Sequence, residues 1–293
     1  MKTYNDVYLN ARKKLRAAGI EAHDLETRLI IAYATGKSRE ELLSVGNEYL
    51  TQVEKLKEID ALLDRRIDGE PVAYIVGEWE FYGIPVKVSK AVLIPRVDTE
   101  VLAEKAIELL KMKSGQKRLL DLCAGCGCVG LAAAANVKNC RVVLADNSEA
   151  ALAVCRQNML GNRLSKMTMA VTADALEAPP AILGAFDMIV CNPPYIPSAH
   201  IESLDRSVKD YEPLSALDGG QDGLNFFRKI AANWSDIIKT GGHMVFECGV
   251  GQADAVCEIM RNTGFLDIKK QTDTLGIERV VYGIKGGFSK SVT

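Results

Sequence analysis

The sequence predicts an α/β fold whose main domain is a doubly wound parallel sheet, and two observations indicate it. From about residue 98 onward, short apolar strands alternate with helical stretches. This order typically gives a parallel sheet with helices on both faces. The first of these strands runs into a glycine-rich turn, residues 125–130 (Gly-Cys-Gly-Cys-Val-Gly), which opens a helix. Such a turn is typical of α/β domains that bind a nucleotide-like ligand.

Length and composition favour one large α/β domain with a smaller companion, since the chain has 293 residues. Hydrophobic residues make up 48%, charged residues 25%, and the formal net charge is −2. This near-neutral balance argues against a basic surface that wraps nucleic acid. No apolar run reaches the roughly 18 residues of a membrane span, and residues 1–6 do not resemble a signal peptide. We expect a cytoplasmic protein that binds neither membranes nor, stably, nucleic acid.

Residues 1–70 are predicted to form a small helical domain. Helical spacing of apolar residues indicates one helix, through Leu25, Leu29, Ile30 and Tyr33. Capping-box sequences at 38–41 and 51–54 predict the starts of two more helices. The last of these carries an apolar stripe formed by Leu56, Ile59, Leu62 and Leu63. Packing against other helices is the simplest role of this stripe, and recognition of a substrate by the assembled helices is the alternative.

Residues 71–97 are predicted to form a β-hairpin linker between the two domains. Gly69-Glu70-Pro71 interrupts the helical pattern. Two β-rich runs follow, residues 79–82 and 86–88, separated by Gly83-Ile84-Pro85. Strand-forming residues on both sides of a glycine indicate a hairpin.

Residues 98–293 are predicted to form the α/β domain. Its strands are short runs of apolar residues bounded by polar or turn-forming ones. The predicted helices span 98–113, 129–136, 148–160, 223–238 and 252–262. The predicted strands span 118–122, 141–145, 167–171, 186–191, 243–247, 266–270 and 278–284.

The glycine turn admits two kinds of ligand. It satisfies the dinucleotide fingerprint G-x-G-x-x-G, and Asp146, at the end of the next strand, is placed to take a ribose hydroxyl. The same glycine-rich turn and ribose-binding carboxylate would also suit S-adenosylmethionine. A turn that has a structural role and binds no ligand is a third interpretation. Asp121, four residues before Gly125, favours a ligand with a cationic amino group, because a pyrophosphate would gain nothing from a carboxylate there.

Two further segments follow strands at the same predicted edge of the sheet. Asp174 comes after the third strand and is placed to reach an adenine edge, although a solvated loop carboxylate is equally consistent. Asn192-Pro193-Pro194-Tyr195 ends the strand 186–191. Asparagine can both accept and donate hydrogen bonds, so it suits a planar amide or amine. A tyrosine can stack on such a group. A strand-ending turn is the alternative for this tetrapeptide.

The eight cysteines are expected to be apolar filler in a reducing compartment. Cys123, Cys126 and Cys128 cluster in the glycine turn, but a structural zinc site needs four ligands. The histidines are scattered singly and no second cysteine pair completes such a site. We therefore predict no metal.

The spaced set Asp121-x-x-x-Gly125-x-Gly127, Asp146, Asp174 and Asn192–Tyr195 resembles the class I S-adenosylmethionine-dependent methyltransferases that modify planar nitrogens. This resemblance covers about residues 115–285. It implies a Rossmann-like, seven-stranded, mostly parallel sheet with the last strand antiparallel. It also implies S-adenosylmethionine as cofactor and S-adenosylhomocysteine as product. The implied cofactor-binding residues are Asp121, Cys123, Ala124, Gly125, Cys126, Gly127, Asp146, Asn147, Asp174, Ala175 and Asn192. Methylation of an exocyclic amine of adenine or guanine in nucleic acid stays open at this point.

The flanking segments narrow the resemblance to protein-(glutamine) methyltransferases that act on peptide chain release factors. Residues 77–83, 92–100, 208–213 and 216–223 resemble that family, which also carries an N-terminal helical domain. The chain departs from the family pattern at Val97, where proline is common, and at Cys123 and Ala124. The resemblance implies a release factor as partner and the glutamine of its Gly-Gly-Gln loop as target. We expect a monomer.

The resemblance assigns substrate binding to Asn192, Pro193, Pro194 and Tyr195, and catalysis to Asn192, Pro193 and Tyr195. The Asn192 oxygen and the Pro193 carbonyl would accept the two hydrogens of the substrate amide. Tyr195 would form a wall of the pocket. Ile196, Pro197 and residues 208–223 are candidates to line a groove for an extended loop. No general base is evident, since His200 and Glu202 lie in a predicted loop whose position relative to the site the sequence does not define. A glutamine of a ribosomal protein and a non-catalytic or NAD-linked nucleotide-binding role remain alternatives.

Overall fold

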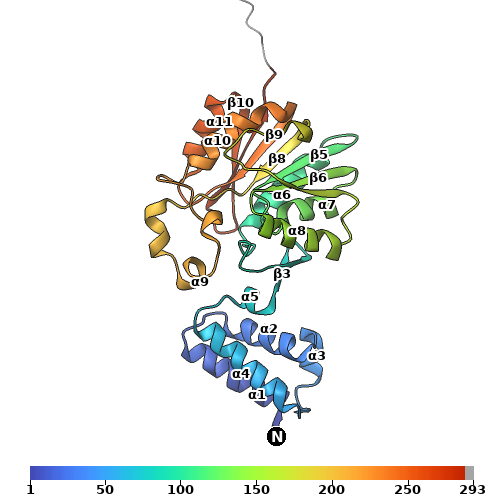
Figure 1. The fold of residues 1–293 in the computed structure, drawn as a ribbon, viewed down its shortest axis with the longest axis vertical. Helices are drawn as coiled ribbons and strands as arrows, with labels where there is room; N and C mark the ends of the chain where they lie inside the picture. Colours follow the sequence, from blue (N-terminus) through green and yellow to red (C-terminus); the bar gives the residue numbers. More distant parts are fainter. Residues whose placement is uncertain (288–293) are drawn as a thin grey trace, which may run out of the picture. The chain divides into compact units, whose positions relative to one another are not determined.

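The computed structural model describes residues 1–287 and separates into two compact units (Figure 1). The first unit comprises Met1–Glu78 and Asp205–Tyr211, and the second comprises Trp79–Leu204 and Glu212–Thr293. The predicted domain boundaries after residues 70 and 97 differ from this division into two units, and they remain predictions. None of the described helices is both long and apolar enough to cross a membrane.

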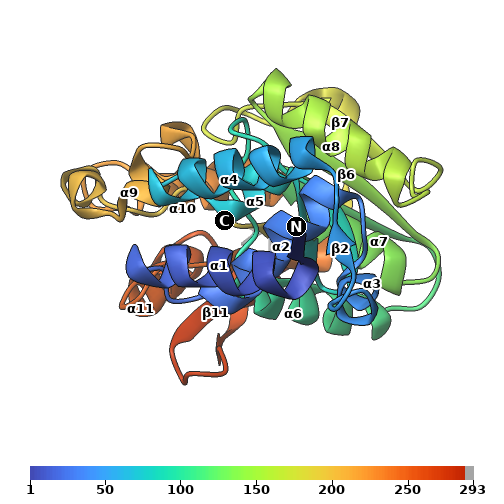
Figure 2. The ribbon, with the colours of Figure 1, turned by 90° about the horizontal axis from the view of Figure 1, so that it is seen from below.

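The first unit is a helical bundle in which α1, α2 and α4 pack on one another (Figure 2). The Ile59, Leu62 and Leu63 side chains of α4 are buried, so the predicted stripe does pack inward. A pair of two-residue strands, β1 (Lys2–Thr3) and β2 (Tyr49–Leu50), joins the start of α1 to the segment before α4. The helices are α1 (Tyr4–Ala17), α2 (His23–Thr35), α3 (Arg39–Ser44), α4 (Val53–Ile67), α5 (Val72–Val76) and α9 (Arg206–Lys209).

Two details of this bundle differ from the sequence-based expectation. The capping box at Ser38 is confirmed, but the one at Thr51 is wrong, because α4 is capped at Gln52 without a side-chain hydrogen bond. Helix α2 forms as expected but buries a face centred on Ile30 and Ile31, and it leaves Leu25 and Tyr33 exposed. Apolar spacing locates the helix, while the neighbouring helices choose which face is buried.

The predicted hairpin is confirmed as a two-stranded sheet of β3 (Glu78–Phe81) and β4 (Ile84–Lys87). Tyr82 and Gly83 both have positive φ, of 48° and 74°. Two such residues suit a tight hairpin turn between twisted strands. Asn158 of α8 (Glu149–Gly161) then holds the end of β4 by accepting from the Lys87 N–H at 2.6 Å and donating to the Lys87 carbonyl at 3.0 Å.

The second unit contains the predicted seven-stranded, mostly parallel sheet, in the order β10-β11-β9-β8-β5-β6-β7. Strand β11 is antiparallel to both of its neighbours, and the other pairings are parallel. The strands are β5 (Lys117–Leu122), β6 (Cys140–Asp146), β7 (Thr168–Thr172), β8 (Phe186–Cys191), β9 (Ile238–Glu247), β10 (Phe265–Thr272) and β11 (Glu278–Lys285). The helices are α6 (Thr99–Lys111), α7 (Cys128–Asn136), α8 (Glu149–Gly161), α10 (Asn225–Trp234) and α11 (Ala253–Asn262).

Helices cover both faces of this sheet, with α6, α7 and α8 on one side and α10 and α11 on the other (Figure 1). A core cluster lies under α10 and α11 and contains Leu120 and Leu122 together with Phe227 and Trp234. Because side chains alternate along a strand, Asp121 points to the opposite face, toward α7. From β5 the chain continues to β6 on one side of β5, while β8 lies on its other side. The switch point of the sheet therefore lies between β5 and β8.

The largest difference in element boundaries concerns β9. The predicted helix 223–238 is shorter, because α10 ends at Trp234 and a 3₁₀ turn over Ser235–Ile237 follows. Strand β9 begins at Ile238 instead of residue 243 and includes Gly241 and Gly242, with a register shift against β8.

Candidate functional site

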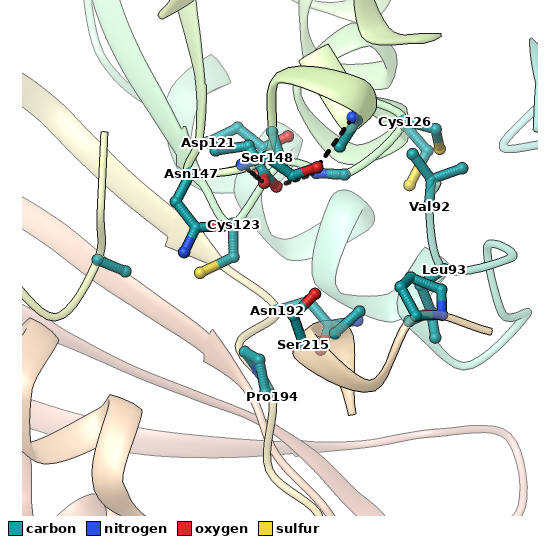
Figure 3. A pocket seen from close by; sticks show the side chains of 18 of the residues that line it. Val92, Leu93, Asp121, Cys123, Cys126, Asn147, Ser148, Asn192, Pro194 and Ser215 are labelled. Atoms are coloured by element: carbon teal, nitrogen blue, oxygen red, sulfur yellow. Dashed lines mark hydrogen bonds between the residues drawn. The ribbon is translucent and has the colours of Figure 1, made fainter. Parts of the chain in front are cut away.

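A cavity lies at the carboxyl ends of β5, β6 and β8 (Figure 3). This is the edge of the sheet, next to the switch point, where open α/β sheets bind their ligands. Its walls come from the glycine turn, from the segments after β6 and β7, and from Asn192 and Pro194 after β8. Two further segments complete the lining, residues 91–96 of the linker and residues 213–216.

The glycines of the turn serve two different needs. Gly125 has φ +55° and Gly127, the residue that caps α7, has φ +84°. A Cβ on Gly127 would lie 2.8 Å from the Cys155 sulfur, and one on Gly130 would lie 2.3 Å from a Leu144 methyl carbon. The first two glycines therefore allow the left-handed turn, and the third lets α7 pack directly on β6.

Asp121 lies beneath this turn, and its side chain is almost completely buried, with 3% of the residue exposed. Its Oδ2 accepts a hydrogen bond from the Gly130 N–H at 2.8 Å, at the first turn of α7. Burial raises the pKa of Asp121 to about 7, against the lowering effect of this bond, and the charge of Asp146 raises it further. The negative charge of Asp121 is thus costly unless a cation lies beside it.

Asp146 is the second carboxylate of the site, and it holds the turn in place. One oxygen accepts from the Gly125 N–H at 2.8 Å and the other from the Ser148 N–H at 2.9 Å. Burial raises the pKa of Asp146 above its usual value, although these amides oppose the shift. Ser148 caps α8 by accepting from the Ala151 N–H at 3.2 Å, so Asp146 connects the starts of two helices.

The other predicted cofactor-binding residues line the same cavity, except Gly127. Cys123, Ala124, Cys126 and Asn147 lie on the β5 and β6 side. Cys123 has φ +61°, an uncommon conformation for a residue with a side chain. Asp174 and Ala175 lie after β7, where the Ala175 carbonyl accepts from the Trp234 indole at 3.1 Å. This bond anchors the loop after β7 to α10.

The tetrapeptide after β8 is divided between the cavity and the core. Asn192 and Pro194 line the cavity, and the Asn192 amide nitrogen donates to the Thr99 hydroxyl at 3.3 Å. Pro193 is buried and Tyr195 half-buried, and neither is among the lining residues. The Tyr195 ring packs against the core cluster, and burial raises the pKa of its phenol. The expected roles of Pro193 and Tyr195 stay predictions, as do those of Ile196 and Pro197, which also lie outside the lining.

Several residues of the cavity were not singled out from the sequence. Thr99, Arg96, Ser148, Ser215 and Phe226 all line it. Arg96 forms an ion pair with the buried Glu212, whose other oxygen accepts from the Ile94 N–H at 3.2 Å. This pair fixes the linker segment against the 213–216 segment, and both belong to stretches that the family resemblance had picked out.

Metal and disulfide chemistry find no support in the part of the chain that the structure describes. In residues 1–287 no group of three or more histidine, cysteine, aspartate or glutamate side chains is placed to hold a metal ion. All eight cysteines are free thiols, and seven of them are buried.

The buried carboxylate of Asp121 indicates which ligand the cavity fits best. A ligand that brings positive charge lowers the cost of ionising Asp121, whereas a pyrophosphate would add negative charge beside it. S-adenosylmethionine carries an ammonium and a sulfonium, so the residues present fit this cofactor and not a dinucleotide. Asn192, on the neighbouring strand end, adds a carboxamide that can bind a planar polar group.

Sequence comparisons agree with this geometry over nearly the whole chain. Two family models match, the PrmC N-terminal domain over residues 6–77 and the methyltransferase small domain over residues 98–205. A release factor glutamine methyltransferase of Clostridium acetobutylicum is 34% identical over 282 residues, which are 96% of this chain and 98% of that protein. One from Geobacter sulfurreducens is 37% identical over 93% of both chains.

Solved structures confirm the methyltransferase fold. The crystal structure of the hMettl16 catalytic domain aligns with a TM-score of 0.56 at 13% identity, over 83% of this chain and 85% of that one. A methyltransferase from Pyrococcus furiosus aligns with a TM-score of 0.50 at 18% identity, over 70% of this chain and 90% of that one. At such low identities these likenesses concern the fold alone.

Proposed function

Because the chain belongs to the release factor glutamine methyltransferase family, we propose that it transfers a methyl group from S-adenosylmethionine to the side-chain amide nitrogen of a release factor glutamine. The observation that carries this proposal is the position of Asn192. Its carboxamide lines the same cavity as Asp121 and Asp146. A cation-binding half and an amide-binding half thus share one pocket.

In the cofactor half, Asp121 would hold the amino group and Asp146 the ribose hydroxyls, and Asp174 would reach the adenine edge. The positive φ of Gly125 supports a close approach of the ligand to the main chain. S-adenosylmethionine, when bound, supplies a methyl group on a positively charged sulfur and leaves as S-adenosylhomocysteine. No metal takes part in the proposed reaction.

In the substrate half, Asn192 and Pro193 would orient the glutamine amide. An amide nitrogen is a poor nucleophile because its lone pair is delocalised into the carbonyl. The Asn192 oxygen and the Pro193 carbonyl would accept the two N–H groups, aim the nitrogen at the methyl group, and stabilise the positive charge that develops on it. Pro194 lines the pocket beside them, and Tyr195 would support this wall from the core side.

The proton leaves the nitrogen after methyl transfer, and we assign its acceptance to water. His200 and Glu202 lie on an exposed 3₁₀ helix, Ser198–Ser203, and neither lines the cavity. A direct displacement of this kind needs no covalent enzyme intermediate.

We further propose that the target is the glutamine of the Gly-Gly-Gln loop of release factors. Residues 1–70 would recognise the release factor, residues 71–97 would act as the linker, and residues 98–293 would carry the reaction. Pro213, Ser215 and Ala216 line the cavity, which supports a role of the 208–223 segment in holding an extended loop. The protein would act as a cytoplasmic monomer.

Labelled S-adenosylmethionine tests this function against its alternatives. The protein is incubated with the cofactor and, separately, a release factor, a ribosomal protein mixture, duplex DNA and ribosomal RNA. We expect label in the release factor alone. Label in DNA or RNA and none in the release factor would indicate methylation of a base amine instead, and label confined to ribosomal protein would indicate another glutamine substrate.

A further inference from the structure

Glu247, a buried carboxylate, lies behind Asn192. It is the last residue of β9, it is 2% exposed, and it does not line the cavity. Cys191 of β8 pairs in register with Phe246 of β9, so the next residues, Asn192 and Glu247, are neighbours across the two strand ends. Cys191 and Phe246 belong to the core under α10 and α11. By alternation, Asn192 and Glu247 face the other side, where α6 begins with Thr99.

These three side chains lie together at the ends of β8 and β9 and at the start of α6. The Asn192 amide nitrogen donates to the Thr99 hydroxyl at 3.3 Å. Both Thr99 and Asn192 favour the charged form of the Glu247 carboxylate and so act to lower its pKa. Its Oε2 has no hydrogen-bond partner among the described residues. An ionised carboxylate can only accept, so it attracts the NH₂ side of the Asn192 carboxamide and repels the oxygen side.

The charged and titratable groups around Glu247 come from several segments of the second unit. Arg279 of β11 lies nearby, held by Asp98 and Asp273 at 3.1 Å each. Asp98 itself, Tyr195 after β8, Cys248 and Cys128 also interact with Glu247. Burial is the largest influence and raises the pKa of Glu247 to about 7, while Thr99, Arg279 and Asn192 act in the opposite direction.

We propose that Glu247 is a positioning residue for methyl transfer. Together with Thr99 it takes the NH₂ group of Asn192, so that the Asn192 oxygen faces the cavity and can accept an N–H of the substrate amide. Without this partner the carboxamide can present either end, and its NH₂ end would repel the substrate N–H groups. The inference rests on the proposed function and adds to it the group that selects the productive orientation of Asn192.

This role predicts that the rate of methyl transfer increases with pH. Ionised Glu247 attracts the Asn192 NH₂ group, and the protonated acid does not. With the pKa of Glu247 at about 7, kcat at saturating cofactor is expected to rise as the pH rises through that value. Asp121 titrates in the same range, but a saturating cationic cofactor holds it ionised, so it does not contribute to this limb.

The test compares Glu247→Gln, Thr99→Val and Thr99→Ser in the full-length protein, using release factor methylation and cofactor binding. We expect Glu247→Gln and Thr99→Val to lower kcat about 10- to 100-fold, the range that small misplacements of catalytic groups produce. Cofactor affinity should stay within about twofold, and the ascending pH limb should vanish in Glu247→Gln. Thr99→Ser keeps the hydroxyl and should retain most of the wild-type rate.

Asp187→Asn is the matched control, because Asp187 is a carboxylate at the opposite end of β8, where it pairs with Lys239 at 2.8 Å. It should leave kcat and the pH limb unchanged. A Glu247→Gln protein with wild-type kcat, or one that loses cofactor binding and kcat in parallel, would overturn the positioning role.

A substrate-free measurement separates this inference from the proposed function. In protein labelled with ¹⁵N-asparagine, the Asn192 side-chain NH₂ signal, assigned through Asn192→Ala, should shift with pH near 7. The shift should disappear in Glu247→Gln. An Asn192 NH₂ signal that does not change with pH would contradict the role of Glu247, whatever the substrate is. If the signal shifts as expected but no release factor is methylated, only the proposed function is contradicted.

Discussion

At the scale of single residues, Asn192 is the group on which substrate chemistry depends. It is the polar side chain at the end of β8, and its NH₂ group is already bonded to Thr99. Its oxygen is therefore the atom available for a substrate N–H. This division of the carboxamide follows from hydrogen bonding within the protein alone.

Replacing Asn192 with alanine should lower kcat by about 1.5 to 3 orders of magnitude. The reason is the loss of about 2 to 4 kcal/mol of transition-state stabilisation, which is typical of one preorganised hydrogen-bonding group. Steady-state methylation of a release factor measures this effect, and calorimetry checks that cofactor affinity is kept. Asn136→Ala is the control, since Asn136 lies at the exposed end of α7 and bonds its own helix at Ala132. Equal rates for the two variants would refute the assignment.

The raised pKa of Asp121 predicts that a proton is released when the cofactor binds. Its pKa is about 7 in the free protein, so near pH 6.5 much of it is protonated. A cationic amino group stabilises the carboxylate, so binding expels a proton and affinity falls as the pH falls below 7. Calorimetry in buffers of different ionisation enthalpy measures the release.

Asp121→Asn should abolish this proton release and weaken cofactor binding about 10- to 100-fold, the value of a charge-assisted hydrogen bond. Asp174→Asn, which changes another carboxylate that lines the same cavity, should keep the release even if it weakens binding. Unchanged proton release in Asp121→Asn would place the titrating group elsewhere.

At the scale of elements, the packing of α7 on β6 depends on Gly130. An alanine there would bring its Cβ within 2.3 Å of a Leu144 methyl carbon and 2.9 Å of Asp121 Oδ2. We expect Gly130→Ala to lower the free energy of unfolding by about 1 to 3 kcal/mol, as overpacking does, and to weaken cofactor binding by displacing Asp121.

Gly161→Ala is the matched variant, because Gly161 ends α8 and a Cβ there meets nothing within 4 Å. It should stabilise the protein by up to about 1 kcal/mol. Urea unfolding of both variants checks the pair. A Gly130→Ala protein as stable as Gly161→Ala would show that α7 does not need the close approach.

Sequence patterns predicted these elements well where the local signal and the tertiary context agree. The strand–turn–helix around Gly125 and the hairpin at Tyr82-Gly83 were both evident from apolar runs and glycine positions. The start of β9 was not, because Gly241 and Gly242 read as a turn although they lie inside the strand, next to its register shift against β8. The buried face of α2 was missed because neighbouring helices, and not apolar spacing alone, determine it.

The candidate site was predictable in part for the same reason. Asp121, Asp146 and Asn192 each lie at the carboxyl end of a recognisable strand, so their convergence at one edge could be expected. Glu247 and Thr99 gave no comparable signal. Their closeness to Asn192 depends on β9 lying beside β8 in a particular register, and strand order is not encoded in local sequence.

At the scale of the whole molecule, two buried carboxyl groups make stability depend on pH. The pKa values of Asp121 and Glu247 are both about 7 in the folded protein, above their usual values near 4. The folded state therefore holds these protons more tightly than the unfolded state. Their contribution to stability is complete below about pH 4 and is lost as the pH rises through 7.

Glu247→Gln should accordingly be more stable than the wild type at pH 8.5, by up to about 3 kcal/mol, and similar to it at pH 4.5. Urea unfolding of the cofactor-free protein at both pH values measures the difference. Carboxyl groups elsewhere are the same in both proteins and cancel in the comparison. If the wild-type protein were more stable than Glu247→Gln at pH 8.5, this would contradict the raised pKa of Glu247.

The most direct test of the central claim is to locate the transferred methyl group. A purified release factor is incubated with S-adenosylmethionine and either the wild-type protein or Asn192→Ala, digested, and sequenced by tandem mass spectrometry. The account predicts one added methyl group on the side chain of the Gly-Gly-Gln glutamine with the wild type, and almost none with Asn192→Ala. A methyl group on any other residue, or equal modification by both proteins, would contradict it.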